Sequence, residues 1–153
     1  MSRKNLKHKK TKNLYSFQTV TNDFCGSLSF RGKKAVQEKV FLKALNSTTN
    51  KDIYSSLSSL RGSIQNVRPS IGIKVKKSSR NSQHIPYPLS TMLSNSTAIK
   101  WISQSTRKKK GGHFSSNLAK EFNDVNNSRG SSMERKLRHY KLAEENRNLS
   151  NTN

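Results

Sequence analysis

The sequence predicts a mainly α-helical, single-domain protein of about six helices, from which a two-stranded β-hairpin protrudes. Most apolar residues recur at spacings of three and four, which is typical of helices, and one short stretch alternates with a period of two. The chain has 153 residues, 30% of them hydrophobic, which is enough for one domain with a modest core. We expect a basic disordered tail at 1–15, a helical domain at 16–148 with its hairpin at about 71–89, and a polar tail at 149–153.

The first two expected helices lie before residue 46. Apolar residues within 24–30 predict a helix that breaks at Gly32. A second helix follows, because its apolar residues fall on one face, and the polar run 46–50 ends it. The residues of that face are Val36, Val40, Phe41, Ala44 and Leu45.

The third expected helix gives the clearest periodic signal in the chain. Asp52 is a good N-cap at its start. Arg68-Pro69 ends it, because the residue before a proline is pushed out of the helical region. Its apolar positions, which step by four, three, four and three residues, are Ile53, Leu57, Leu60, Ile64 and Val67.

The expected hairpin begins where the period changes to two. Ile71, Ile73 and Val75 alternate with glycine and lysine, and after a polar turn at 78–82 a second alternating stretch covers 85–89. Prolines 86 and 88 exclude a central sheet strand there. An isolated hairpin is marginally stable, so we expect its base to pack on the helices while its tip reaches a partner.

Three more helices are expected after the hairpin. The fourth starts near Thr91 and ends in the basic run 107–110 before two glycines, where cations complement the helix dipole. The fifth steps along 114–125 and stops near Asn126-Asn127. Ser131 to Glu134 match the S-x-x-E capping box and predict the start of the sixth. The apolar faces are expected to hold Met92, Ile99 and Ile102 with Trp101 packed beside them, then Phe114, Leu118, Phe122 and Val125, then Met133, Leu137 and Tyr140.

The charge of the chain predicts a polyanionic partner. Thirty Lys and Arg stand against eight Asp and Glu, giving a formal charge of +22. A compact state with this charge repels itself unless a polyanion neutralises it, and a nucleic acid is the obvious one. Residues 53–120 contain no acid, so they must present an uncompensated positive face wherever they fold. For the run 107–110 alone, a solvated face or a localisation signal is an equally good interpretation.

The motifs of enzymes are absent from the sequence, which predicts no enzyme, no cofactor and no metal. The four histidines have no HxxxH or HExxH spacing, and no GxxxxGK[ST], GxGxxG or GxSxG loop occurs. The single cysteine, Cys25, allows neither an internal disulfide nor a thiolate metal site, and we expect it to be buried. No apolar run approaches the ~20 residues that span a bilayer, so no membrane partner is expected.

The order of elements and several short motifs together resemble small-subunit ribosomal protein seven, of bacterial and organellar type. The resemblance covers about residues 24–148. Its strongest part is the segment 98–102, where this family carries an Ala-Ile-Arg-Trp type motif followed by a basic cluster. The matching stretches are Gly32-Lys33-Lys34, Asn66-Val67-Arg68-Pro69, Ile85-Pro86, Ala98-Ile99-Lys100-Trp101-Ile102, residues 107–110, residues 114–125, Arg129-Gly130 and Ala143-Glu144-Glu145-Asn146.

The resemblance implies a structural constituent of the small ribosomal subunit. Such a protein binds the 3′ major (head) domain of small-subunit rRNA, nucleates head assembly, and lies beside head and platform proteins near the exit-site tRNA and the mRNA exit path. The hairpin tip, 78–83, departs from the family in lacking a glycine-containing turn, and the C-terminus lacks the family's aromatic ending. The family's contacts are therefore not carried onto those two parts.

Basic side chains are the candidate RNA-binding residues, with RNA shape supplying specificity. The alternative is a basic packaging protein that binds nucleic acid without regard to sequence, and an enzyme acting on RNA is a distant third. Lysine and asparagine codons are AT-rich, so a mitochondrial ribosome is the first expectation, with a plastid or bacterial cytoplasmic ribosome as alternatives. The candidates are Lys33, Lys34, Lys74, Lys76, Lys77, Arg80, Arg107, Lys108, Lys109, Lys110, Arg129, Arg135, Lys136 and Arg138.

Overall fold

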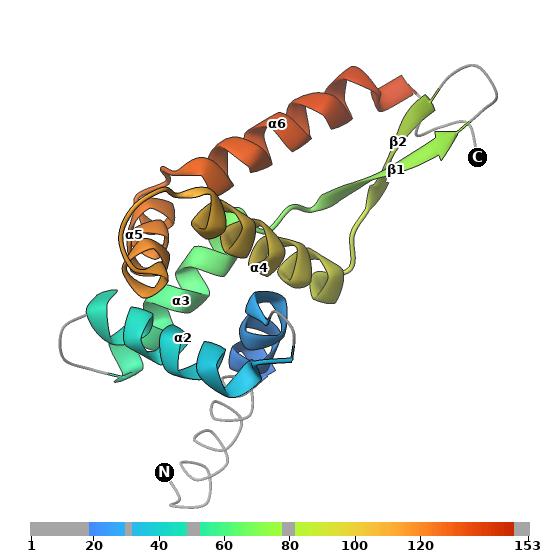
Figure 1. The fold of residues 1–153 in the computed structure, drawn as a ribbon. Coiled ribbons are helices and arrows are strands. Elements are labelled where there is room, and N and C mark those ends of the chain that lie inside the picture. The colour runs from blue at the N-terminus through green and yellow to red at the C-terminus, as the bar shows by residue number, and fades with distance from the viewer. Residues whose placement is uncertain (1–18, 30–31, 49–52, 78–81, 149–153) are drawn as a thin grey trace, which may run out of the picture.

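Helices surround one core, and a two-stranded hairpin extends from them (Figure 1). The computed structural model describes residues 19–29, 32–48, 53–77 and 82–148. Within these residues the predicted mainly α fold with a protruding hairpin is confirmed. The elements are a helical segment at 19–28, α2 (Lys34–Thr48), α3 (Ile53–Val67), β1 (Ile71–Lys77), β2 (Ser82–Pro88), α4 (Thr91–Lys108), α5 (Phe114–Asn126) and α6 (Ser131–Glu145).

Three phenylalanines join the N-terminal elements to α5 at the centre of the core. Phe24 stacks on Phe41 with ring centroids 5.2 Å apart, and Phe122 meets both rings edge-on at 5.7 and 6.4 Å. These are the offset and T-shaped arrangements that aromatic quadrupoles favour. Trp101 on α4 is 6% exposed and belongs to the same cluster, so its predicted core position is confirmed.

Helix α4 is buried although serine and threonine are frequent in it. The Ser103 hydroxyl donates to the Ile99 carbonyl at 2.8 Å, and the Thr106 hydroxyl donates to the Ile102 carbonyl at 2.9 Å. A hydroxyl bonded to the carbonyl four residues earlier is satisfied without water and can enter a core. This is how a chain with so few large apolar residues still packs helices on several sides of α4.

The hairpin pairs β1 with β2 in an antiparallel register that runs from Ile71 opposite Pro88 to Lys77 opposite Ser82. With only two strands in this sheet, both are edge strands, so the β2 prolines remove no ladder bond from an interior strand. The base of the hairpin is attached to α6, which passes beside it (Figure 1).

Three side chains of α6 hold the hairpin base, and we call them the α6 clamp: Lys136, His139 and Tyr140. The Lys136 ammonium donates to the Asn66 carbonyl at 2.6 Å, and His139 Nε2 lies 2.9 Å from the Ile71 carbonyl oxygen. The Tyr140 hydroxyl accepts from the backbone N–H of Ser70 at 3.0 Å. Burial raises the pKa of Tyr140, but the hydrogen bonds with Ser70 and the nearby Lys136 charge outweigh burial and lower the pKa overall.

The assignment of three residues to apolar faces is wrong, because the structure places these residues in solvent. Met92 is 79% exposed, Leu137 65% and Val36 53%. Met92 and Val36 occupy the first turns of their helices, which extend past the core, and Leu137 lies on the outer side of α6. The expected Asp52 N-cap, the hairpin tip at 78–81 and both tails lie outside the described residues.

Candidate nucleic-acid interface

Three adjoining hollows follow the outer side of α4 and form what we call the basic groove. The first lies between the segment 19–28 and α4, the second between α4 and α6, and the third at the hairpin base; their volumes are about 390, 680 and 460 Å³. They adjoin because neighbouring hollows share lining residues. We define the groove by its basic side chains and one amide, and one acid, Asp23, also lines the first hollow. The defining residues are Lys100, Gln104, Arg107, Lys108, Arg135 and Arg138.

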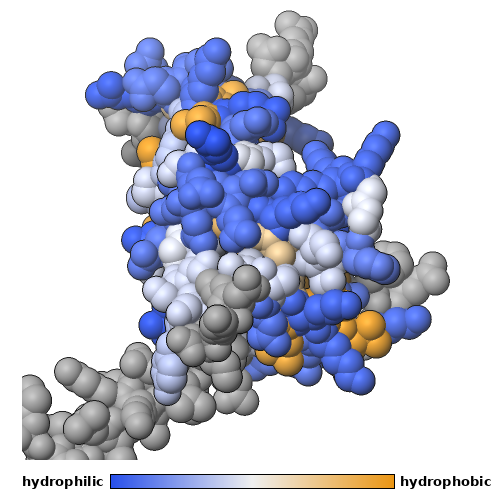
Figure 2. Space-filling view, turned by 90° about the vertical axis from the view of Figure 1, so that its left-hand side faces the viewer, coloured by the Kyte–Doolittle hydropathy of each residue, from blue (hydrophilic) through white to orange (hydrophobic). Residues whose placement is uncertain are grey.

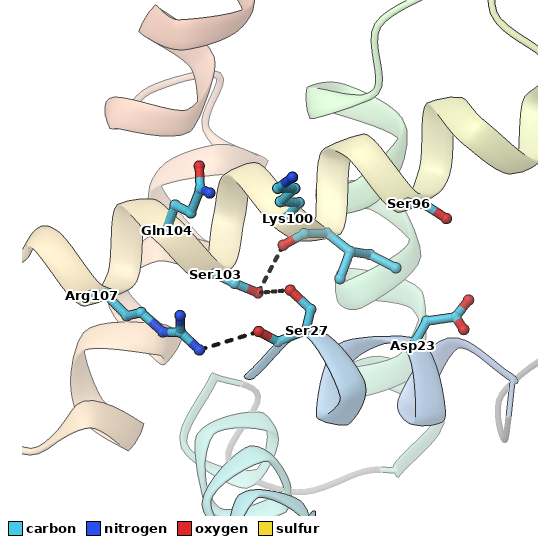
Figure 3. A pocket seen from close by; sticks show the side chains of 8 residues that line it. Asp23, Ser27, Ser96, Lys100, Ser103, Gln104 and Arg107 are labelled. Carbon is cyan, nitrogen blue, oxygen red and sulfur yellow. Dashed lines mark hydrogen bonds between the residues drawn. The ribbon is translucent and has the colours of Figure 1, made fainter. Parts of the chain in front are cut away.

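Arg107 closes one end of the first hollow (Figure 3). Its Nη2 donates to the carbonyls of Ser27 at 3.2 Å and Leu28 at 3.0 Å, the last two residues of the helical segment 19–28. A cation at the C-terminus of a helix satisfies free carbonyls and complements the helix dipole. Beside it the Ser27 hydroxyl donates to Ser103 Oγ at 3.0 Å, so Arg107 and Ser103 of α4 together fix the N-terminal segment.

Lys109 turns inward, unlike the exposed Lys108 and Lys110 on either side of it. Its ammonium lies 2.8 Å from Oε2 of Glu121 and 2.8 Å from Oδ2 of Asp124. Burial by itself lowers the pKa of Lys109, but hydrogen bonds and attraction to the two carboxylates outweigh burial and raise the pKa. The basic run therefore divides into residues that face solvent and one that holds α4 to α5.

The partner of Lys109 is a fully buried carboxylate whose other oxygen organises the start of α6. Glu121 Oε1 accepts from the Ser132 backbone N–H at 3.2 Å and from its hydroxyl at 2.5 Å. The expected capping box at Ser131 to Glu134 is therefore wrong. Gly130, with φ +96°, is the N-cap and has no side chain that could cap the helix. The buried Glu121 carboxylate of α5 accepts from the first-turn N–H of Ser132 in its place.

The basic residues of α6 divide in a similar way. The Arg135 guanidinium lies 5.5 Å from the Trp101 ring centroid and donates to Gln104 Oε1 across the groove. Lys136 is committed to the α6 clamp, and its ammonium also lies 5.8 Å from the Tyr140 ring centroid. Arg138 is exposed and faces the groove. Cation–π contact and the Gln104 bond hold Arg135 in a fixed position before any ligand arrives.

The remaining candidates lie at exposed positions in three other places. Lys33 lies just before α2 and Lys34 begins it. Lys74, Lys76 and Lys77 lie on β1, and Lys110 and Arg129 lie in the connections on either side of α5. Arg80 lies outside the described residues. Among the described candidates, the structure thus brings Arg107, Lys108, Arg135 and Arg138 together in the groove. It commits Lys109 and Lys136 to contacts within the protein and leaves the rest of the described candidates on separate surfaces. RNA contact by any of these residues stays a prediction.

Sequence reasoning did not select two groove residues, Lys100 and Gln104. Both lie on one face of α4 with Arg107, at steps of four and three residues, opposite the apolar stripe. That polar stripe is the signal that could have found them.

The face of the molecule drawn in Figure 2 is strongly polar. Hydrophilic residues cover most of the face in Figure 2, and hydrophobic ones occur there only in small separate groups. No helix among the described residues has the length and apolar character needed to cross a bilayer. In the same part of the chain, no three His, Cys, Asp or Glu side chains gather as metal ligands would.

A basic groove and a lysine-rich hairpin on a small helical domain are the features expected of a protein that binds a polyanion. The family model described as "Ribosomal protein S7p/S5e" matches residues 1–147, and the chain belongs to this family of ribosomal proteins. The resemblance read from the ordered motifs is thereby confirmed. A ribosomal protein family also supports the expectation of a structural component rather than an enzyme.

Two bacterial proteins illustrate the relationship. The small ribosomal subunit protein uS7 of Pelagibacter ubique (strain HTCC1062) is 26% identical over 149 residues, which cover 96% of each chain. The protein of the same name from Wigglesworthia glossinidia brevipalpis is 27% identical over 128 residues, or 84% of this chain and 82% of that one. The similarity therefore extends over the whole domain and is not confined to one motif.

Proposed function

We propose that the protein is a structural constituent of the small ribosomal subunit that binds the 3′ major domain of its rRNA. In this proposal it nucleates assembly of the head and lies near the exit-site tRNA and the mRNA exit path, beside head and platform proteins. The observation that carries the proposal is the basic groove, whose second and third hollows have several cations and no acid among their lining residues. The names of the bacterial relatives supply the small-subunit setting.

The groove is suited to the phosphate backbone of a folded RNA. Arg107 and Arg135 have fixed positions through protein contacts, while Lys108 and Arg138 extend from neighbouring helices with exposed side chains. Phosphate contacts set position and orientation but carry little sequence information, so the shape of the RNA must supply the selectivity. The exposed lysines of β1 extend the positive surface along the hairpin toward a second part of the ligand.

Binding of two transcripts tests this proposal. The full chain should bind a transcript of the 3′ major domain much more tightly than one of the 5′ domain at physiological salt. Lys108→Gln and Arg138→Gln should each weaken binding and reduce the salt slope by about 1, because each contributes one phosphate contact. Lys43→Gln is the matched control: an exposed lysine of α2 outside the groove, whose loss should change affinity less than twofold.

Equal affinity for the two transcripts would reject the proposal and favour a packaging protein that ignores RNA shape. Co-sedimentation with the small subunit after a salt wash is the second test, and protein found only in free form would contradict a ribosomal role. For the compartment we propose a mitochondrial ribosome, with plastid and bacterial ribosomes as alternatives. Fractionation of cells that express a tagged chain distinguishes them.

A further inference from the structure

The third hollow, at the base of the hairpin, combines aromatic and basic side chains. It measures about 460 Å³, within the range of about 300–1,000 Å³ typical of small-ligand sites. The hairpin contributes Tyr87, α4 contributes Trp101, and α6 contributes Arg135, Arg138 and His139. No acid is among its lining residues, so an anionic group can enter without repulsion from the walls.

The backbone of the opposite strand fixes the Tyr87 ring. Gly72 is its cross-strand partner, and a Cβ on that glycine would lie 2.7 Å from Cζ and 2.9 Å from Cε1 of the ring. Only a residue without a side chain allows the ring to lie this close to the strand. Tyr87 is nevertheless 41% exposed, so a held aromatic surface remains open to solvent. Such a ring can stack on a nucleobase at little entropic cost.

Two arginines line the same hollow as Tyr87. A cation–π contact with Trp101 and a hydrogen bond to Gln104 hold Arg135 in place. Arg138 lies further along α6 and is exposed. The same two arginines also line the second hollow, so the aromatic site lies at one end of a positively charged track. A charged track that ends in an aromatic platform is the arrangement that binds unpaired nucleotides.

We propose that this hollow binds one unpaired nucleotide of the rRNA, with its base stacked on Tyr87 and its phosphate on Arg135 and Arg138. The inference rests on the proposed rRNA binding and adds to it a site for a single extruded base. Because Gly72 of β1 leaves room for the Tyr87 ring of β2, both strands of the hairpin take part in the site.

Photocrosslinking tests the site without changing the protein. The wild-type full chain is bound to a 4-thiouridine-substituted transcript of the 3′ major domain, irradiated and digested with trypsin. A uridine adduct on Tyr87 is expected, within the tryptic peptide 81–100. Binding of the transcript with adducts only on peptides away from the hairpin base and α6 would overturn the nucleotide site and leave rRNA binding intact.

Affinity measurements on variants supply the second arm. Tyr87→Leu should weaken binding of the same transcript about 5- to 100-fold, while Tyr87→Phe, which keeps the ring, should stay within about twofold. Tyr54→Leu is the matched control, because Tyr54 on α3 is 79% exposed and does not line the hollow. Unchanged affinity for Tyr87→Leu rejects the stacking site. Failure of the wild-type chain to bind the transcript rejects both the site and the proposed function.

Discussion

The inward-facing Lys109 leads to a stability prediction that depends on which member of its ion pair is removed. Glu121 is fully buried, whereas the Lys109 side chain is 25% exposed and has a second carboxylate, Asp124, at 2.8 Å. Lys109→Met leaves a buried carboxylate with hydrogen bonds from Ser132 alone, which should cost about 3–5 kcal/mol. Glu121→Gln keeps an oxygen for Ser132 and leaves Lys109 with Asp124 and water, which should cost only about 1–2 kcal/mol.

The double variant sharpens this expectation. Lys109→Met combined with Glu121→Gln removes both charges, so it should be more stable than Lys109→Met alone and close to Glu121→Gln. Asp124 then loses its ion pair, but its side chain is 46% exposed and the loss costs little. Lys110→Met is the control, because this exposed neighbour in the same basic run should change stability by less than about 0.5 kcal/mol.

Urea unfolding of the full chain, followed by far-ultraviolet circular dichroism and extrapolated linearly, measures all four variants. The reasoning is refuted if Lys109→Met is no less stable than Lys110→Met. It is equally refuted if Glu121→Gln costs more than Lys109→Met, since the buried carboxylate would then not be the group that needs its partner.

Three further predictions concern the same fold. Cys25 is buried, and burial, followed by the Glu38 charge, raises the pKa of its thiol. Iodoacetamide at pH 8 should therefore label this thiol only as fast as the chain unfolds, and rapid labelling of the folded protein would contradict this. Gly130→Ala places a side chain at φ +96°, with its Cβ 3.1 Å from Asp124 Cβ. Thermal unfolding should therefore show a loss of stability of more than about 1 kcal/mol, and an unchanged Tm would argue against this N-cap geometry. The raised pKa of Lys109 gives stability that is present below pH ~10.4 and lost as pH rises through the pKa of the folded state. The wild-type chain should therefore approach Lys109→Met in stability only in urea titrations at strongly alkaline pH. A difference between the two that stays constant up to pH ~12 would be inconsistent with the ion pair.

The sequence predicted the parts of the fold that local patterns determine. The bounds expected for α3 agree with the structure, because a step of three and four residues reports burial on one side of a helix. The hairpin could also be predicted from the sequence, because a change to a period of two followed by prolines indicates a pair of edge strands. Met92 shows the limit of such patterns: helical spacing describes a face, but it does not say where the core that covers the face ends.

The candidate site was less accessible from sequence, because its contacts join distant residues. The basic run 107–110 was visible, but nothing within it distinguishes Lys109 from its neighbours. The signal lies in α5, where Glu121 falls on the apolar face between Leu118 and Val125 and therefore needs a buried partner. Which lysine meets it depends on the turn at Gly111 and Gly112, both at positive φ, that brings α5 back against α4. Tyr87 gave no local signal, because its role depends on a glycine in the other strand.

The α6 clamp has a consequence for how this part of the protein can change in evolution. Lys136 and His139 contact the carbonyl oxygens of Asn66 and Ile71, and Tyr140 accepts from the N–H of Ser70. These are main-chain atoms, present whatever side chain a position carries, except that proline would remove the N–H at 70. The three clamp contacts therefore do not depend on the side chains at 66, 70 and 71, although Val67 and Pro69 in the same stretch are fixed by burial in the core. Substitutions that break the attachment are expected at the three α6 side chains.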